Sequence, residues 1–161
     1  GRLLLYMNRG LLLKHAPDRD KNVRTIFFAI LSALVADEEA QRRGVVLVIL
    51  VDPKWFQWQD YDRTLVKRFI RMFTTMMPMR IVAFHHVSNS NPMFEKMLPM
   101  LWFSMGKHLR LRYRLHNDEE PGENADELKQ FGIDPAGITE DMGGVLDPEM
   151  TAAMWLNEVI E

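Results

Sequence analysis

The segment 45–51 restricts the fold of this chain more than any other. It is an unbroken run of valine, leucine and isoleucine that follows Gly44 and ends at Asp52 and Pro53. A strand with one face in water alternates apolar and polar residues, whereas a strand covered on both faces reads as a continuous apolar run rich in β-branched residues. The run therefore predicts a central strand of a parallel sheet, with helices packed on both sides.

Segments with the periodicity of strands or helices surround this central strand. Apolar residues at spacings of three and four predict helices, and short β-branched or alternating runs predict strands. In the segment 109–115 the alternation leaves three arginines on one face, which predicts a strand with one wet face. The other predicted elements are strands at 3–7 and 81–87 and helices at 23–35, 65–77, 92–107, about 124–131 and about 148–160. This order predicts an α/β fold with a mostly parallel sheet flanked by helices and with right-handed crossovers.

The bulk composition limits the size, the partners and the compartment of the protein. A chain of 161 residues fits one domain, and its 20 basic and 22 acidic residues leave a net charge of -2, which does not favour nucleic acid as a partner. The sequence has no cysteine and no run of roughly 18 apolar residues. We therefore expect a cytoplasmic protein without disulfides. Because the chain begins at Gly1 and Arg2 and enters an apolar segment at once, we expect residues 1–161 to be a single domain cut from a longer protein.

The sequence lacks the common motifs for catalysis and for metal binding. No predicted strand is followed by GxGxxG or GxxxxGKS/T, and there is no GxSxG nucleophile elbow. We therefore expect no enzyme activity and no cofactor. His85 and His86 are neighbours on a predicted strand, where adjacent side chains point to opposite faces and cannot readily share a metal ion. We expect no metal site, with one histidine hydrogen-bonded in the core and the other facing a cavity or a helix.

The predicted helix 92–107 has almost no polar face. Between Met93 and Met105 its only charges are Glu95 and Lys96. Such a helix is either a core helix buried on every side or a lid that covers an apolar cavity with one face and meets a membrane with the other. Basic residues follow the helix directly, and they fit either contacts with lipid phosphates or a solvated strand face. These residues are Lys107, His108, Arg110, Arg112 and Arg114.

Several short motifs follow one another along the chain in a recognisable order. They are Gly1-Arg2 before an apolar strand, Gly44 to Val46 leading to Asp52, Met77 to Ile81, His86 to Asn89 with Asn91 to Phe94, Arg112 to His116, and Ile138 to Gly144, with Trp155 further on. Together they resemble the CRAL-TRIO lipid-binding domain of retinaldehyde-binding and tocopherol-transfer proteins. Asn117 replaces a glycine of the family, and Ile138-Thr139 stands where Leu-Pro is usual. Met79 stands where phosphatidylinositol-transfer members have glutamate, which argues against phosphatidylinositol as the ligand.

The resemblance implies a function and a set of site residues. It implies an apolar cavity that has the sheet as its floor and is closed by the helix 92–107, with a lipid that is exchanged at membranes and transferred between them. The alternative is a lipid-regulated protein-interaction or membrane-targeting module without transfer. The residues expected to contact the lipid are Phe69, Met72, Phe73, Met76, Phe84, His86, Phe94, Met97, Leu98 and Leu101. An anionic head group, such as that of a phosphoinositide in the membrane, is assigned to His108, Arg110 and Arg112.

Overall fold

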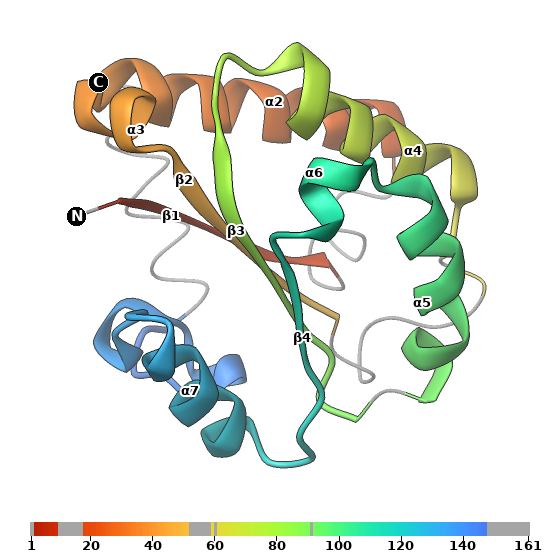
Figure 1. Ribbon diagram of the computed structural model, residues 1–161, viewed down its shortest axis with the longest axis vertical. Helices are drawn as coiled ribbons and strands as arrows, with labels where there is room; N and C mark the ends of the chain where they lie inside the picture. The colour runs from red at the N-terminus through yellow and green to blue at the C-terminus, as the bar shows by residue number, and fades with distance from the viewer. Residues whose placement is uncertain (1, 10–17, 52–58, 60, 91, 148–161) are drawn as a thin grey trace.

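A parallel sheet runs through the middle of the domain (Figure 1). The computed structural model describes residues 2–9, 18–51, 59, 61–90 and 92–147. The sheet is four-stranded, and its order β1-β2-β3-β4 follows the order of the chain. The strands are β1 (Leu3–Asn8), β2 (Val45–Leu50), β3 (Ile81–Val87) and β4 (Tyr113–His116). The predicted α/β fold with a parallel sheet is therefore confirmed.

The strand β2 is covered on both of its faces, as its composition predicts. Leu47 and Ile49 belong to one apolar core, whereas Val48 and Leu50 belong to a second core on the opposite face. All of these side chains are buried. Because successive residues of a strand point to opposite faces, a strand between two cores needs apolar residues at every position. This explains the unbroken apolar run.

The helices divide unevenly between the two faces of the sheet (Figure 1). Among the α-helices of the described segments, α7 (Pro121–Gln130) covers the smaller core, to which it contributes Ala125 and Leu128. Met142 of the 3-10 helix η4 (Glu140–Met142) also belongs to this core. The other α-helices of the described segments all contribute to the larger core on the opposite face. They are α2 (Arg19–Ala36), α3 (Glu38–Arg43), α4 (Arg63–Arg71), α5 (Pro92–Ser104) and α6 (Lys107–Arg110). The larger core therefore lies between the sheet and the helices α4 and α5. The lipid is expected in this same space.

Aspartate side chains fix the starts of α2 and α4. Asp18 accepts hydrogen bonds from the backbone N–H groups of Asp20 and Lys21, and Asp62 does the same for Thr64 and Leu65. Such caps satisfy N–H groups that have no partner within the helix. The far end of α4 continues as a π-helix, η2 (Met72–Met76), in which the Met77 N–H donates to the Met72 carbonyl at 3.0 Å.

The basic segment 109–115 is not one strand, and that prediction is wrong. Its first residues belong to the short helix α6, and β4 begins only at Tyr113. The alternation of leucine and arginine does not report burial here, because Leu109 is 5% exposed whereas Leu111 is 67% exposed. Two parallel strands need a crossover between them, and α5 and α6 occupy most of the connection from β3 to β4. The three arginines of this segment therefore do not share one strand face.

The ends of the chain bear on two further predictions. The helix expected near 124–131 is α7, which begins earlier, with Pro121 in its first turn. The helix expected near 148–160, with Trp155, lies outside the described residues, as do Gly1, Asp52 and Asn91 of the motifs. Among the helices that are described, none has both the length and the apolar character needed to cross a bilayer.

Candidate functional site

A small apolar cavity lies in the larger core, between the sheet and the helices α4 and α5. Its volume is about 40 Å³, whereas small-molecule sites measure about 300–1,000 Å³. The residues around it are Met7, Arg9, Leu47, Ile49, Val66, Phe69, Ile70, Phe73, Ile81, Phe84, His86, Leu101 and Leu109. The side chains of α5 thus pack directly against those of the sheet, and a lipid needs more room than this arrangement leaves.

The structure brings most of the expected contact residues into one cluster. Phe69, Phe73, Phe84, His86 and Leu101 line the cavity. Met72, Phe94 and Met97 are buried in the same core, and Leu98 packs against it, but these residues do not line the cavity.

Met76 does not belong to this cluster, because it is 57% exposed. Met76 was expected in the cavity wall because the predicted helix 65–77 has regular α-helical spacing up to its last residue. In the π-helix each hydrogen bond spans five residues rather than four, so the wider turn brings Met77 inward instead. The expected place of Met76 in the cavity wall is therefore corrected.

His86 is the polar side chain in the sheet wall of the cavity. It is 3% exposed and lies among aromatic rings, with its ring centroid 4.3 Å from that of Phe94 and 5.6 Å from that of Phe84. Neither ring nitrogen has a hydrogen-bond partner within the described part of the chain. Burial, and next the positive charge of Arg9, lower the pKa of His86 to about 3. The imidazole is therefore neutral at physiological pH.

Arg9 is a cavity residue that the sequence interpretation missed. It follows the last residue of β1, is 9% exposed and lines the cavity together with His86. No motif or apolar period includes Arg9, which follows the predicted strand 3–7. The signal that could have identified it is positional, since ligands of parallel sheets bind beyond the carboxyl ends of the strands, and Arg9 stands at that end of β1.

His85 lies on the opposite face of β3 from His86 and belongs to a different network. Its Nδ1 is 2.8 Å from His116 Nε2, and His116 Nδ1 is 2.6 Å from Glu127 Oε2. Burial first, then the charges of His116 and Arg114, lower the pKa of His85 to about 4. The prediction that one histidine is hydrogen-bonded in the core while the other faces a cavity is therefore confirmed.

Helix α5 is apolar both toward the core and toward solvent. Phe94, Met97 and Leu101 are buried, whereas Phe103 is 83% and Trp102 41% exposed. The exposed residues Met100, Trp102 and Phe103 form what we call the outer face of α5. Of the two interpretations of the sequence, a core helix buried on every side is therefore wrong. The helix has instead the two apolar sides that a lid requires.

The basic residues after α5 lie in the connection to β4. His108 is exposed on α6, Arg110 ends that helix half-buried, and Arg112 is half-buried just before β4. Arg114 is exposed, and its Nη1 donates to the Tyr113 carbonyl at 2.8 Å. The predicted head-group residues thus follow the exposed end of α5 along the chain, although not along one strand.

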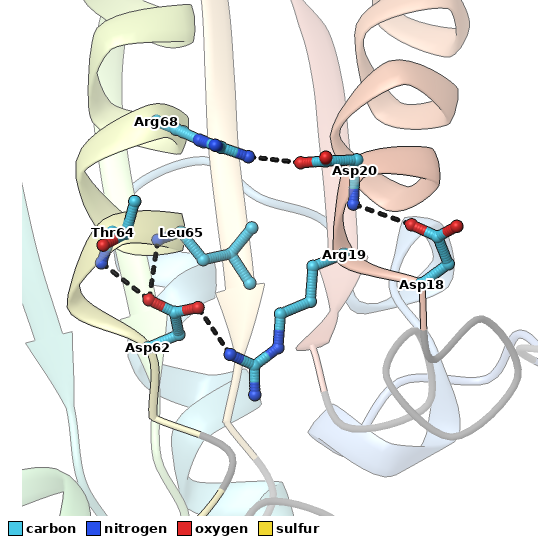
Figure 2. A pocket seen from close by; sticks show the side chains of 7 residues that line it. All are labelled: Asp18, Arg19, Asp20, Asp62, Thr64, Leu65 and Arg68. Atoms are coloured by element: carbon cyan, nitrogen blue, oxygen red, sulfur yellow. Dashed lines mark hydrogen bonds and ion pairs between the residues drawn. The ribbon is translucent and has the colours of Figure 1, made fainter.

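A second, polar pocket lies between the starts of α2 and α4 (Figure 2). Its volume is about 400 Å³. Arg19 Nη1 is 2.5 Å from Asp62 Oδ2, and Arg68 pairs with Asp20. The backbone hydrogen bond from Leu65, with the other donors nearby, lowers the pKa of Asp62. The charged side chains in Figure 2 therefore pair with one another or cap the two helices. Their role is to hold the start of α2 against the start of α4.

The residues 138–144 form a turn that is anchored to β1. The Asp141 carboxylate accepts hydrogen bonds from Tyr6 Oη at 2.7 Å, Asn8 Nδ2 at 2.6 Å and Thr139 Oγ1 at 2.5 Å. Gly143 has a φ of 81°, and a Cβ there would lie 2.3 Å from the Pro121 carbonyl oxygen. This glycine therefore permits the close approach of the turn to α7.

The comparison with protein families agrees with this structure. The family model of the divergent CRAL/TRIO domain matches residues 2–151, a span that includes all four strands and the cavity between sheet and α5. No curated protein matches the chain. The family assignment indicates lipid binding, and it confirms the resemblance seen in the motifs. The chain therefore belongs to the divergent CRAL/TRIO domain family.

Proposed function

We propose that the domain binds one apolar lipid between the sheet and α5 and transfers it between membranes. The observation that carries this proposal is the two-sided apolar character of α5, with Leu101 buried against the sheet and Phe103 83% exposed. Exposed apolar surface rimmed by polar residues is typical of contacts with membranes or partners. In this proposal the outer face of α5 docks on a bilayer while the buried side covers the ligand.

Ligand entry in this proposal requires α5 to move away from the sheet. The cavity of about 40 Å³ is far smaller than the roughly 300–1,000 Å³ of sites that enclose small molecules. Pro99 lies inside α5 and removes one backbone hydrogen bond, which weakens the helix near its middle. Met97 of α5, Met105 just after it and Met72 of the π-helix η2 are buried in the larger core, and thioether side chains adapt to irregular apolar shapes. Movement of α5 would exchange these contacts for contacts with the lipid.

The basic residues after α5 support docking on an anionic membrane. A lysine or arginine close to such a surface contributes about 1 kcal/mol. We assign His108, Arg110 and Arg112 to the anionic head groups, phosphoinositides included, that surround the docked helix. The protein is proposed to act in the cytoplasm, transiently at membranes, as a carrier that performs no reaction on its ligand and needs no metal or cofactor.

A second candidate function is a lipid-regulated protein-interaction or membrane-targeting module that lacks transfer activity. The small size of the cavity favours it, because a domain that no longer carries a ligand gains stability by closing the space between α5 and the sheet. The outer face of α5 would then contact a protein or stay on the membrane. The two candidates differ in whether a lipid leaves the donor membrane.

Transfer of a fluorescent lipid from donor to acceptor vesicles tests the proposal. The wild-type protein is expected to accelerate transfer in proportion to its concentration. Vesicle binding without acceleration would support the second candidate instead. A protein that neither binds vesicles nor accelerates transfer would contradict the transfer proposal and the membrane-targeting form of the second candidate.

A further inference from the structure

Two polar side chains, those of His86 and Arg9, lie in the sheet wall of the cavity. The register of the sheet places Met7 beside Ile49 and Ile49 beside His86, so these residues form one row across β1, β2 and β3. Arg9 comes two positions after Met7, and all four residues line the cavity. His86 and Arg9 are thus the polar part of an otherwise apolar wall, near the carboxyl ends of the strands.

His86 is a buried polar group whose hydrogen-bonding capacity is unused in the described structure. It is 3% exposed, it lines the cavity, and neither of its ring nitrogens has a partner among the described residues. Leaving a buried polar group without a partner costs free energy, so such groups are rare and point to a function. The neighbouring rings of Phe84 and Phe94 offer it no hydrogen bond. A bound molecule is the partner that the cavity can supply.

The charge near His86 selects among the groups that could bind there. The low pKa of His86 leaves a neutral ring with one N–H donor and one acceptor nitrogen. Arg9 lines the same cavity with a guanidinium group, and its positive charge is felt at His86. A guanidinium group binds a carboxylate through two parallel hydrogen bonds. An anionic oxygen group therefore fits this end of the cavity better than a neutral one.

We propose that the lipid of this domain is an acidic one, and that its carboxylate lies inside the cavity and is bound by the imidazole N–H of His86 and the guanidinium of Arg9. The apolar chain then extends along the phenylalanines of the wall toward α5. This inference rests on the proposed function, because it identifies the chemical class of the lipid bound at the same site. It also assigns two separate roles to positive charge, with Arg9 for the ligand and the residues after α5 for the membrane.

Three probes that share one apolar chain test the proposal. Palmitate, hexadecanol and methyl palmitate, each radiolabelled, are incubated with the protein, and the amount retained after gel filtration is measured. The wild-type protein is expected to retain palmitate at least about tenfold better than methyl palmitate, which corresponds to the loss of one strong charge-assisted hydrogen bond. His86→Leu is expected to reduce this ratio to near one.

A matched variant of the apolar wall separates recognition of the carboxylate from general packing. Phe73→Leu changes a cavity residue that has no polar group, so it is expected to weaken retention of all three probes without changing their ratio. Circular dichroism checks that both variants are folded. A wild-type ratio near one, a ratio that survives His86→Leu, or equal retention of palmitate and hexadecanol would overturn this inference while lipid binding stands. Retention of none of the probes would overturn the proposed function with it.

Discussion

His85 Nδ1 lies 2.8 Å from His116 Nε2, on the face of the sheet opposite to His86. Glu127 accepts a hydrogen bond from Nδ1 of His116, which leaves Nε2 of that ring as an acceptor for the Nδ1–H of His85. This arrangement gives the Nδ1–H of a neutral His85 a hydrogen-bond acceptor. Protonation of His85 would place a positive charge in the core, beside His116 and near Arg114.

The buried side chains of His85 and His86 make the stability of the fold depend on pH. Burial holds the pKa of His85 at about 4 and that of His86 at about 3, below the 6.5 of an unfolded chain. Their contribution is complete above pH 6.5, where both states are neutral, and it is lost as the pH falls toward 4 and 3, because the unfolded chain binds protons first. Between pH 7 and pH 4.5 we expect the free energy of unfolding to fall by about 2 kcal/mol per histidine, as measured by urea denaturation. An unfolding free energy that does not change over this range would contradict the prediction.

Replacement of His86 by leucine is expected to stabilise the protein in the absence of ligand. The change replaces a buried polar side chain that has no hydrogen-bond partner in the described structure by an apolar side chain of similar size. We expect the free energy of unfolding at pH 7 to rise by about 1 kcal/mol. Phe84→Leu, on the same strand and in the same wall, is the control and is expected to lower it by about 1 kcal/mol. A loss of stability in His86→Leu would show that the histidine has a structural partner.

The carboxylate of Asp141 is expected to be a main link between β1 and the turn 138–144. Asp141→Ala removes the acceptor of three side-chain hydrogen bonds, including those from Tyr6 and Asn8. We expect it to lower the free energy of unfolding by about 2–3 kcal/mol, whereas Tyr6→Phe, which removes only one of these bonds, costs about 1 kcal/mol. Urea denaturation of both variants measures the difference. Equal effects of the two substitutions would contradict a shared network centred on Asp141.

The outer face of α5 is expected to determine membrane binding. Phe103→Asp replaces an 83% exposed phenylalanine and is expected to leave stability nearly unchanged. Because insertion of a phenylalanine into an apolar phase contributes about 1.5–3 kcal/mol, vesicle binding in a sedimentation assay is expected to weaken by at least about tenfold. Phe28→Asp is the matched control, since Phe28 is 62% exposed on α2. Equal losses in the two variants would place the membrane contact elsewhere.

The basic connection after α5 is expected to add a salt-dependent term to membrane binding. Arg112→Ala removes about 1 kcal/mol of attraction to an anionic surface, which is about a fivefold weaker affinity for vesicles that contain phosphoinositides. The difference from wild type is expected to shrink as salt rises, because ions screen the charge. Arg24→Ala, an exposed arginine of α2, is the control and is expected to have little effect. A loss that does not depend on salt would indicate a structural role for Arg112.

The sequence predicts the central parts of the fold well, because burial on both faces leaves a strong local pattern. The run 45–51 and the segment 81–87 are apolar at positions that only a covered strand requires, and they are β2 and β3. Helix α5 starts at Pro92, the first residue of the predicted helix 92–107, and proline is favoured in the first turn of a helix. The motifs also identified the family, because their order along the chain is more specific than any one of them.

The features that the sequence did not predict depend on geometry that periodicity does not encode. The pattern of Leu109 and Leu111 suggests a strand, but the crossover to β4 places one inside and one outside. Met76 follows a helical period that the π-helix changes. Arg9 lines the cavity because β1 pairs with β2, and the sequence near Arg9 does not predict that pairing. The volume of the cavity likewise follows from packing between distant segments.

The mass of the protein under native conditions, measured after incubation with mixed-lipid vesicles and separation from them, tests the central claim most directly. We predict a species heavier than the bare chain by the mass of one lipid, which organic extraction releases and which the Phe103→Asp variant acquires more slowly than Phe28→Asp. A protein that returns from the vesicles at the mass of the bare chain would contradict lipid binding between the sheet and α5.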